Sequence, residues 1–362
     1  MRLTAPPRRR GSQLAALARR IAAAAAHPLV PEDYLDLVAP LRSGADLRGR
    51  VVDVVPETAD AVTIRIRPGR SWAGHVAGQY TRIGVDVDGV RCWRPYSLTS
   101  RCAAPDGLIS ITVKAIPDGR VSGYVQRDLT PGTLVHLDHA TGDFVLGAHR
   151  GPTLFVTAGS GITPVMGMLR NHLDELDDVV LVHSAPTPDA VVFGTELRRW
   201  HASSRLRLVE RHTEHDGQLS PADLDAVVPD WRTRQTWACG PVGLLDALEE
   251  HWAAEEPAAA LHTERFRPLV LATGEGGQVT FTRAGAVVDA DGATTLLDAG
   301  EDAGVLMPSG CRMGICFGCV VPLRSGTVRD LRTGDVTTAT PDDDVRIQTC
   351  VSAAAGPCEI DL

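Results

Sequence analysis

The chain has 362 residues, of which 44% are apolar and 22% charged, a composition ordinary for a globular protein of two or three domains. No run approaches the roughly 18 consecutive apolar residues of a membrane-spanning helix, and no apolar signal region follows the basic start, so we expect a cytoplasmic protein. The net charge of −9 is uneven, because residues 275–362 hold 13 acidic side chains against six arginines; this argues against nucleic-acid binding and favours a basic partner surface.

The first 44 residues are predicted to form a segment of their own. They open with a stretch rich in proline and arginine, and residues 12–26 have the spacing and composition of a basic helix. A proline-containing strap follows over residues 27–41. Two interpretations of the helix stay open: it packs on the neighbouring domain or ends as a frayed tail, or it rests on the inner face of a membrane.

Two sequence patterns divide the middle of the chain. Residues 45–150 alternate apolar and polar side chains between Pro-Gly and Asp-Gly turns, which predicts a small antiparallel barrel. Residues 151–268 alternate buried strands with helical segments, which predicts a parallel sheet covered on both faces. A short linker is expected at 269–276, and residues 277–362 predict a hairpin, a short helix, a cysteine loop and a closing strand.

The cysteine loop carries the strongest chemical signal. Cys311, Cys316 and Cys319 have the spacing C-x4-C-x2-C, and Cys350 follows after 30 further residues. This is the plant-type ligand pattern of a 2Fe–2S cluster. Three ligands can curl around one side of a compact cluster only if the backbone is permissive, and the loop contains three glycines, Gly310, Gly314 and Gly318. A structural zinc site is the alternative, but zinc usually takes a second C-x2-C pair or histidines.

A motif at the end of a predicted barrel strand has residue types that suit a flavin. It consists of Arg94, Pro95, Tyr96 and Ser97. An arginine can bind a phosphate through two nitrogens, a tyrosine offers a flat face, and a serine hydroxyl can hydrogen-bond the flavin nitrogen that receives hydride. Without its context, the same motif would be an ordinary strand end.

A second motif follows the first apolar strand of the parallel-sheet region and opens a helix. Its glycines would let a pyrophosphate approach the backbone, and we expect Thr163 to cap the helix with Pro164 at its first position. The motif departs from the G-x-G-x-x-G dinucleotide fingerprint and is weak evidence alone. It reads Gly159-Ser160-Gly161-Ile162-Thr163-Pro164.

Taken together, residues 45–362 resemble the ferredoxin-NADP reductase superfamily fused to a C-terminal plant-type 2Fe–2S ferredoxin domain. Arg94-Pro95-Tyr96-Ser97 resembles its flavin motif. Gly119-Arg120-Val121-Ser122 resembles its Gly-x-x-Ser element, where a helix N-terminus holds the flavin phosphate. The glycine motif at 159–164 matches its G-x-G-x-T-P, and Cys239-Gly240-Pro241 matches a Cys-Gly-Pro whose cysteine lies near the nicotinamide C4.

The resemblance implies a set of site residues. Ser97 and Cys239 would be catalytic, and Cys311, Cys316, Cys319 and Cys350 would bind the cluster. Lys114 is either a flavin contact or a surface charge. The residues implied to bind flavin or nicotinamide cofactors are Arg94, Pro95, Tyr96, Ser97, Lys114, Gly119, Val121, Ser122, Gly159, Gly161, Thr163, Pro164, Cys239, Gly240 and Pro241.

The choice between related cofactors stays open in part. FAD is favoured over FMN, although both occur in the superfamily. NADPH is slightly favoured over NADH, because Ser184 follows the second predicted strand as in NADPH-specific relatives, although their adjacent arginine is missing. No acidic side chain stands there, as an NADH ribose would favour.

The implied architecture is an antiparallel flavin-binding barrel, a parallel-sheet nicotinamide-binding domain and a β-grasp ferredoxin domain. The implied function is an NAD(P)H-dependent electron-transfer reductase, expected to be a monomer, that serves an external protein such as a Rieske oxygenase, a haem-thiolate monooxygenase or a membrane acyl-CoA desaturase. The stretch PLVPEDYLDLVAPL before the barrel looks most like actinobacterial oxidoreductases that supply a stearoyl-CoA desaturase. The alternative is a redox-sensing iron–sulfur flavoprotein with incidental reductase activity.

Overall fold

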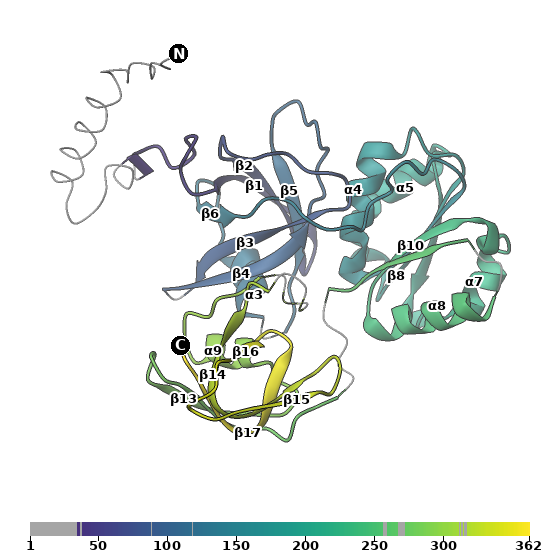
Figure 1. Ribbon diagram of the computed structural model, residues 1–362. Coiled ribbons are helices and arrows are strands. Elements are labelled where there is room, and N and C mark those ends of the chain that lie inside the picture. The colour runs from purple at the N-terminus through teal and green to yellow at the C-terminus, as the bar shows by residue number, and fades with distance from the viewer. Residues whose placement is uncertain are drawn as a thin grey trace, which may run out of the picture.

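The computed structural model describes residues 35–36, 38–87, 89–117, 119–255, 259–266, 272–310, 312, 314 and 317–362. Figure 1 shows three bodies: a barrel in blue, a second domain in teal and green, and a C-terminal domain in green to yellow. The barrel contacts both of the others. Among the helices within the described ranges, none is long and apolar enough to cross a membrane.

The barrel is a six-stranded antiparallel sheet with strand order β4-β3-β6-β1-β2-β5. Pairing between Leu98 and Ile111 joins the end of β4 to β5 and closes the sheet. Ile64, Ile66 and Ile111 are fully buried inside it, as the alternating pattern requires. Its elements are β1 (Arg48–Thr58), β2 (Ala61–Pro68), β3 (Tyr80–Val87), β4 (Val90–Ser97), β5 (Ile109–Lys114), α3 (Arg120–Arg127) and β6 (Leu134–Leu137).

The second domain is a five-stranded parallel sheet with order β11-β10-β7-β8-β9. Helices α4 and α5 pack on one face and α7 and α8 on the other, so the strands are buried on both sides. The strand order reverses between β7 and β10, which opens a crevice at their carboxyl ends. Its elements are β7 (Thr153–Ala158), α4 (Ile162–His172), β8 (Val179–Ala185), α5 (Gly194–Ala202), β9 (Arg207–His212), α6 (Thr213–Asp216), α7 (Pro221–Val227), β10 (Gln235–Cys239), α8 (Val242–Ala254) and β11 (Leu261–Glu264), with single 3-10 turns at η1 (Gly159–Gly161), η2 (Pro188–Ala190) and η3 (Trp231–Thr233).

The C-terminal domain has a mixed sheet with order β13-β12-β17-β14-β15, and β16 also pairs with β14. Strands β12 and β17 run parallel, and helix α9 packs its leucines into the core beneath the sheet. The predicted hairpin, short helix and closing strand are all present. The elements are β12 (Gly277–Phe281), β13 (Ala286–Ala290), α9 (Leu296–Asp302), β14 (Val320–Asp330), β15 (Val336–Ala339), β16 (Val345–Gln348) and β17 (Ser352–Ile360).

The predicted fold class is confirmed, but one local prediction was wrong. The turn Gly159–Gly161 runs directly into α4, so the helix begins at Ile162 rather than at Pro164. Thr163 does not cap it; its hydroxyl donates to the Ser160 carbonyl at 3.0 Å. Pro164 is tolerated there because the first four N–H groups of a helix have no intrahelical acceptor. The predicted basic helix at 12–26 and most of the predicted strap lie outside the described residues.

Hydrogen bonds hold the outer domains on two sides of the barrel. On one side, helix α4 is hydrogen-bonded to the chain that follows β4: Arg170 donates to the Thr99 carbonyl at 2.8 Å and Asn171 to the Ser100 carbonyl at 3.1 Å. On the other side, Arg120 at the start of α3 donates to the Glu301 carbonyl of the C-terminal domain at 2.9 Å. The three domains therefore meet around the ends of β4 and β5.

Candidate functional site

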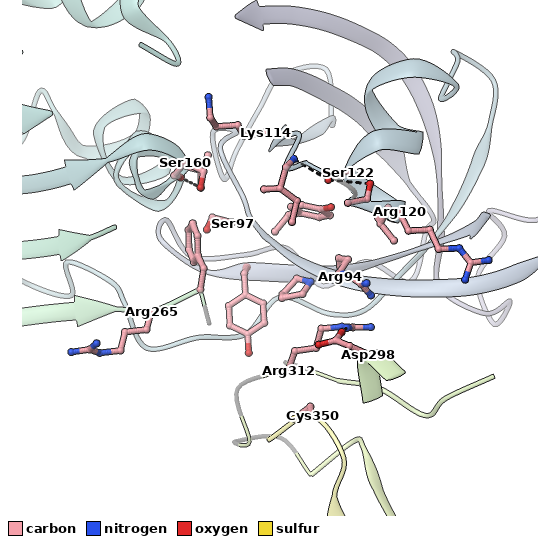
Figure 2. A pocket seen from close by; sticks show the side chains of 18 of the residues that line it. Arg94, Ser97, Lys114, Arg120, Ser122, Ser160, Arg265, Asp298, Arg312 and Cys350 are labelled. Carbon is pink, nitrogen blue, oxygen red and sulfur yellow. Dashed lines mark hydrogen bonds and ion pairs between the residues drawn. The ribbon is translucent and has the colours of Figure 1, made fainter. Parts of the chain in front are cut away.

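A cavity of about 550 Å³ lies where the three domains meet (Figure 2). The barrel contributes the end of β4, the end of β5 and the start of α3. The second domain contributes the turn after β7 and the segment at the end of β11, and the C-terminal domain contributes α9 and Cys350. Motifs that are more than 200 residues apart in the sequence thus face one space.

Arg94, Pro95, Tyr96 and Ser97 are the last four residues of β4, and all line this cavity. Ser97 is 4% exposed, and its hydroxyl oxygen has no hydrogen-bond partner among the described residues. A buried hydroxyl without a partner is costly, so its position suits a bond to a bound group. Burial raises the pKa of Tyr96 to about 12, which keeps its hydroxyl protonated.

The predicted phosphate element forms the N-terminus of α3, with Gly119 as the capping residue. A Cβ atom at this position would lie 2.3 Å from the Ser122 hydroxyl and 2.5 Å from the Ile116 side chain, so only glycine fits. Gly119, Val121 and Ser122 all line the cavity. The N-terminus of a helix carries a partial positive charge, which favours an anion at this end.

Lys114 lies at the end of β5 and also lines the cavity. Its ammonium group is 2.5 Å from the Asp60 carboxylate. This ion pair satisfies the charge of Lys114 and fixes the side chain at the cavity wall. The position agrees with the predicted flavin contact, while the pairing gives Lys114 a structural reason to be there.

The glycine motif after β7 lies beneath the same cavity. Ser160 and Thr163 line it, and Gly159 adopts a φ of +54°. A Cβ atom on Gly161 would lie 2.0 Å from the Cys239 carbonyl oxygen, so this close approach of two loops requires glycine. The turn therefore presents backbone to the cavity at the carboxyl edge of the sheet, where doubly wound sheets bind nucleotides.

Cys239 ends β10 beside this turn, followed by Gly240 and by Pro241 at the N-terminus of α8. Its side chain is fully buried and is not among the residues that line the cavity. Burial raises the pKa of the thiol well above its usual range, so the group stays neutral. Cys239 is thus a packed thiol beside the glycine turn, and its catalytic role stays a prediction.

No sequence motif predicted that the end of β11, the strand beside β10, forms part of the site. Glu264 ends β11 directly opposite Cys239, and Arg265 and Phe266 continue into the cavity wall. The Glu264 Oε2 atom is shielded from solvent and has no partner among the described residues. Burial raises the pKa of Glu264 to about 8. The available signal was a carboxylate at the carboxyl end of a parallel strand, the edge where ligands bind.

Two of the four predicted cluster ligands are described, and they lie together. Cys319 and Cys350 are buried, and their sulfur atoms are 3.2 Å apart. The hydrogen bond between these two side chains lowers the pKa of Cys319 to about 6, toward the thiolate form that binds iron. Cys311 and Cys316 lie outside the described residues. Because Cys350 also lines the cavity, the predicted cluster and flavin sites adjoin.

The residues fit the groups that the sequence predicts. An unpartnered hydroxyl, a glycine-capped helix N-terminus and an arginine surround one part of the cavity, which suits a flavin with its phosphate. Paired buried thiols at the far wall suit a cluster. The fold and site therefore define a class: a single-chain flavin reductase with a nucleotide-binding domain and a ferredoxin domain.

Comparison with known families agrees with this class. The chain matches the oxidoreductase FAD-binding domain over residues 55–146, the oxidoreductase NAD-binding domain over 155–250, and the 2Fe-2S iron-sulfur cluster binding domain over 279–355. These matches support FAD, NAD(P)H and a 2Fe–2S cluster as its cofactors. The chain belongs to the NAD(P)H oxidoreductases of the ferredoxin-reductase type that carry a C-terminal 2Fe–2S domain.

Individual relatives match most of the chain. An NADPH oxidoreductase of Mycobacterium tuberculosis is 48% identical over 352 residues, which cover 95% of this chain and 92% of the relative. The ferredoxin reductase component of 3-ketosteroid-9-alpha-monooxygenase from Mycolicibacterium smegmatis is 31% identical and covers 77% of this chain and 86% of its own. Phthalate dioxygenase reductase has the same fold, with a TM-score of 0.62 at 22% identity over 87% of this chain and 97% of its own.

Proposed function

We propose that this protein is the reductase component of a multi-protein oxygenase-type system, passing electrons from NAD(P)H through FAD and the 2Fe–2S cluster to a separate acceptor protein. The observation that carries the proposal is the shared cavity. The flavin motif, the nucleotide turn and Cys350 all line it, so a flavin there would touch both its electron donor and its electron acceptor. When bound, the flavin accepts two electrons from NAD(P)H as a hydride, and the cluster takes them up one at a time.

The chain's own residues would bind and orient these groups. Arg94 and the N–H groups at the start of α3 would hold the flavin phosphate, and the turn at 159–163 would hold the pyrophosphate of the nucleotide. The Ser97 hydroxyl would hydrogen-bond the flavin at the atom that receives hydride. Neutral Cys239 would pack behind the nicotinamide, and neutral Glu264 would offer it a hydrogen-bond donor.

The acceptor is proposed from the relatives and from the N-terminal sequence. Relatives serve a steroid monooxygenase and a glycine betaine monooxygenase, which supports an oxygenase-type acceptor. The stretch PLVPEDYLDLVAPL supports the narrower proposal of a membrane fatty-acyl desaturase. NADPH is the proposed donor, because the relative that covers 95% of the chain is an NADPH oxidoreductase.

The proposed electron path predicts that loss of the cluster affects the reduction of two artificial acceptors differently. Cys350→Ser removes a proposed cluster ligand, so iron and sulfide should fall while FAD remains. Reduction of ferricyanide, which can take electrons directly from the flavin, should stay within about twofold of wild type, whereas cytochrome c reduction should fall about tenfold or more.

Cys358→Ser is the matched control. This thiol is also buried in the C-terminal domain, but it lies outside the cavity. It should retain iron and both activities. If Cys350→Ser kept its cluster, or lost both activities while folded and flavin-loaded, the proposed path would be wrong. Candidate acceptor proteins, added one at a time with NADPH, then test the oxygenase and desaturase proposals.

A further inference from the structure

One buried carboxylate connects the ferredoxin domain to the flavin motif. Glu301 lies in the last turn of α9, and its side chain is only 6% exposed. Its Oε2 atom is 3.1 Å from Nη1 of Arg94, and its Oε1 atom contacts Nη2 of Arg312. No sequence motif assigns Glu301 a role. We call Arg94, Glu301 and Arg312, together with the Trp93 carbonyl described below, the interdomain clasp (Figure 2 shows the two arginines).

All three side-chain nitrogens of Arg312 are hydrogen-bonded. Its Nε donates to the Trp93 carbonyl of β4 at 3.2 Å, its Nη1 binds Asp298 at 2.8 Å, and its Nη2 binds Glu301. Arg312 also adopts a φ of +58°, which an L residue takes only when its surroundings impose it. The loop that carries the predicted cluster ligands is therefore fastened to the strand that carries the flavin motif.

Arg94 is held by the clasp but keeps part of its guanidinium available. Its Nη1 donates to both the Trp93 carbonyl, at 2.9 Å, and Glu301. Its Nε and Nη2 have no partner among the residues that the structure describes, and the side chain lines the cavity. Arg94 can thus bind Glu301 and an anion in the cavity at the same time. A fixed guanidinium loses less conformational freedom when it binds a phosphate.

A second contact converges on the same residue. Arg120, the first residue of α3, donates to the Glu301 backbone carbonyl at 2.9 Å. Arg120 follows Gly119, whose helix end is the other proposed phosphate contact. Both elements proposed to hold the flavin phosphate are therefore bonded to one residue of the ferredoxin domain.

We propose that Glu301 is a positioning residue that couples flavin binding to the docked position of the ferredoxin domain; this rests on the proposed function. Its carboxylate orients Arg94 toward the flavin phosphate and, through Arg312, holds the cluster loop against the same site. Without it, two guanidinium groups would share a buried region without their common counter-ion, and they would move apart. The ferredoxin domain would then sit less firmly on the cavity, and the flavin phosphate would lose an oriented partner.

The test compares Glu301→Gln with Asp302→Asn, which removes one charge from the exposed neighbouring position of the same helix. Flavin is first removed from each full-length protein, and FAD affinity is measured by fluorescence titration. Glu301→Gln should weaken FAD binding about tenfold or more, because it removes a buried charge-assisted contact. Asp302→Asn should stay within about twofold. The difference should persist at high salt, because a buried pair is poorly screened.

Rapid mixing of each FAD-saturated protein with NADPH gives the second readout. In Glu301→Gln the flavin should be reduced at close to the wild-type rate, while cluster reduction should slow about tenfold. A purely structural role would change both or neither. Combining Glu301→Gln with Arg94→Lys should weaken FAD binding less than the two separate effects predict, because Glu301 acts through Arg94.

The outcomes separate the two proposals. Wild-type protein without FAD or iron would overturn the proposed function. Glu301→Gln with the FAD affinity and cluster-reduction rate of Asp302→Asn, in a wild type that binds both cofactors, would overturn the clasp alone. If Glu301→Gln loses its iron, Glu301→Asp replaces it as the test variant. Glu301→Asp keeps the charge but withdraws the carboxylate by one methylene, so its FAD affinity and cluster-reduction rate should fall less than those expected for Glu301→Gln. Unchanged affinity and rate in an iron-loaded Glu301→Asp would also overturn the coupling.

Discussion

The two walls of the interdomain cavity are built differently. The wall formed by the barrel and the nucleotide-binding domain holds two buried polar atoms, Ser97 Oγ and Glu264 Oε2, that have no partner within the described part of the chain. On the ferredoxin wall, Arg312 has all three side-chain nitrogens bonded, and its partner Glu301, which does not itself line the cavity, has both carboxylate oxygens bonded. A buried polar group without a hydrogen-bond partner destabilises the fold, and a ligand that bonds to it can recover this free energy. A group whose hydrogen bonds are all made can only stabilise its existing contacts. The first wall, which we call the unsaturated wall, is therefore suited to bind cofactors. The second, which we call the saturated wall, is suited to keep the ferredoxin domain in place.

The largest expected effect tests the unsaturated wall at Ser97. Ser97→Ala should lower the rate of flavin reduction by NADPH about a hundredfold, because it removes the proposed hydrogen bond to the atom that receives hydride. Stability measured without cofactor should hold or rise, since no residue that the structure describes is hydrogen-bonded to this hydroxyl. Rapid-mixing absorbance at the flavin band measures the rate, and thermal unfolding without cofactor measures the stability.

Ser100→Ala is the control for Ser97→Ala. Its hydroxyl is also buried and unpartnered among the described residues, but it does not line the cavity. Flavin reduction in Ser100→Ala should match wild type. Equal rates in both variants would remove the proposed distinction between cavity-facing and merely buried hydroxyls.

A smaller effect is expected from Glu264 on the same wall. Burial raises the pKa of its carboxyl to about 8. Between its ordinary pKa and about pH 8, only the unfolded chain is ionised at this site, so unfolding releases a proton and stability falls as pH rises. Below that window both states are protonated, and above it both are ionised.

Glu264→Gln removes this proton while keeping the shape of the side chain. The melting temperature of the variant minus that of wild type should therefore grow with pH between about pH 5 and about pH 8, by about 3 °C per pH unit. It should level off above that range. A difference that is constant with pH would mean that the carboxyl titrates normally and that this wall is less dry than its geometry indicates.

The sequence predicted the unsaturated wall much better than the saturated one. The flavin motif, the Gly-x-x-Ser helix start and the glycine turn are short patterns whose residue types carry their own chemistry, and all three line the cavity. Glu264 was missed because a single acidic residue at the end of a strand does not form a recognisable motif. The cap at Thr163 was predicted wrongly because α4 begins two residues before Pro164, directly after a 3-10 turn that the motif does not reveal.

The clasp could not be predicted because it depends on how complete domains pack. Glu301 and Arg94 are separated by 207 positions, and in the sequence Glu301 is one of three acidic residues on a short helix. Its burial appears only when the barrel covers α9. Local patterns therefore predicted the groups that line the cavity, while the contacts between domains around the cavity required the assembled structure.

The smallest expected effect concerns the outer surface of the ferredoxin domain, where the acceptor would dock. Asp342, Asp343 and Asp344 form an exposed acidic run before β16. They are not equivalent. The Thr340 hydroxyl and backbone N–H both donate to the Asp343 carboxylate, and these hydrogen bonds stabilise the turn. They also lower the pKa of Asp343. Asp342 has no partner among the described residues, and Asp344 lies 3.8 Å from Arg346 with 88% of its side chain exposed.

A double variant, Asp342→Asn with Asp344→Asn, therefore removes charge without breaking the turn. Electrostatic steering to a basic acceptor should make wild-type turnover fall as ionic strength rises past roughly 0.15 M, where the Debye length is about 8 Å. The double variant should raise the acceptor KM about two- to threefold at low salt and flatten the salt dependence.

The control is Asp189→Asn with Glu214→Gln, which removes two exposed charges from the nucleotide-binding domain. It should change neither the acceptor KM nor the salt dependence. Cluster reduction within the protein should stay independent of salt in all of them, because the clasp is buried. If acceptor turnover were equally insensitive to salt in wild type, the acidic run would have no docking role, and the contrast between a screened outer surface and an unscreened inner contact would fail.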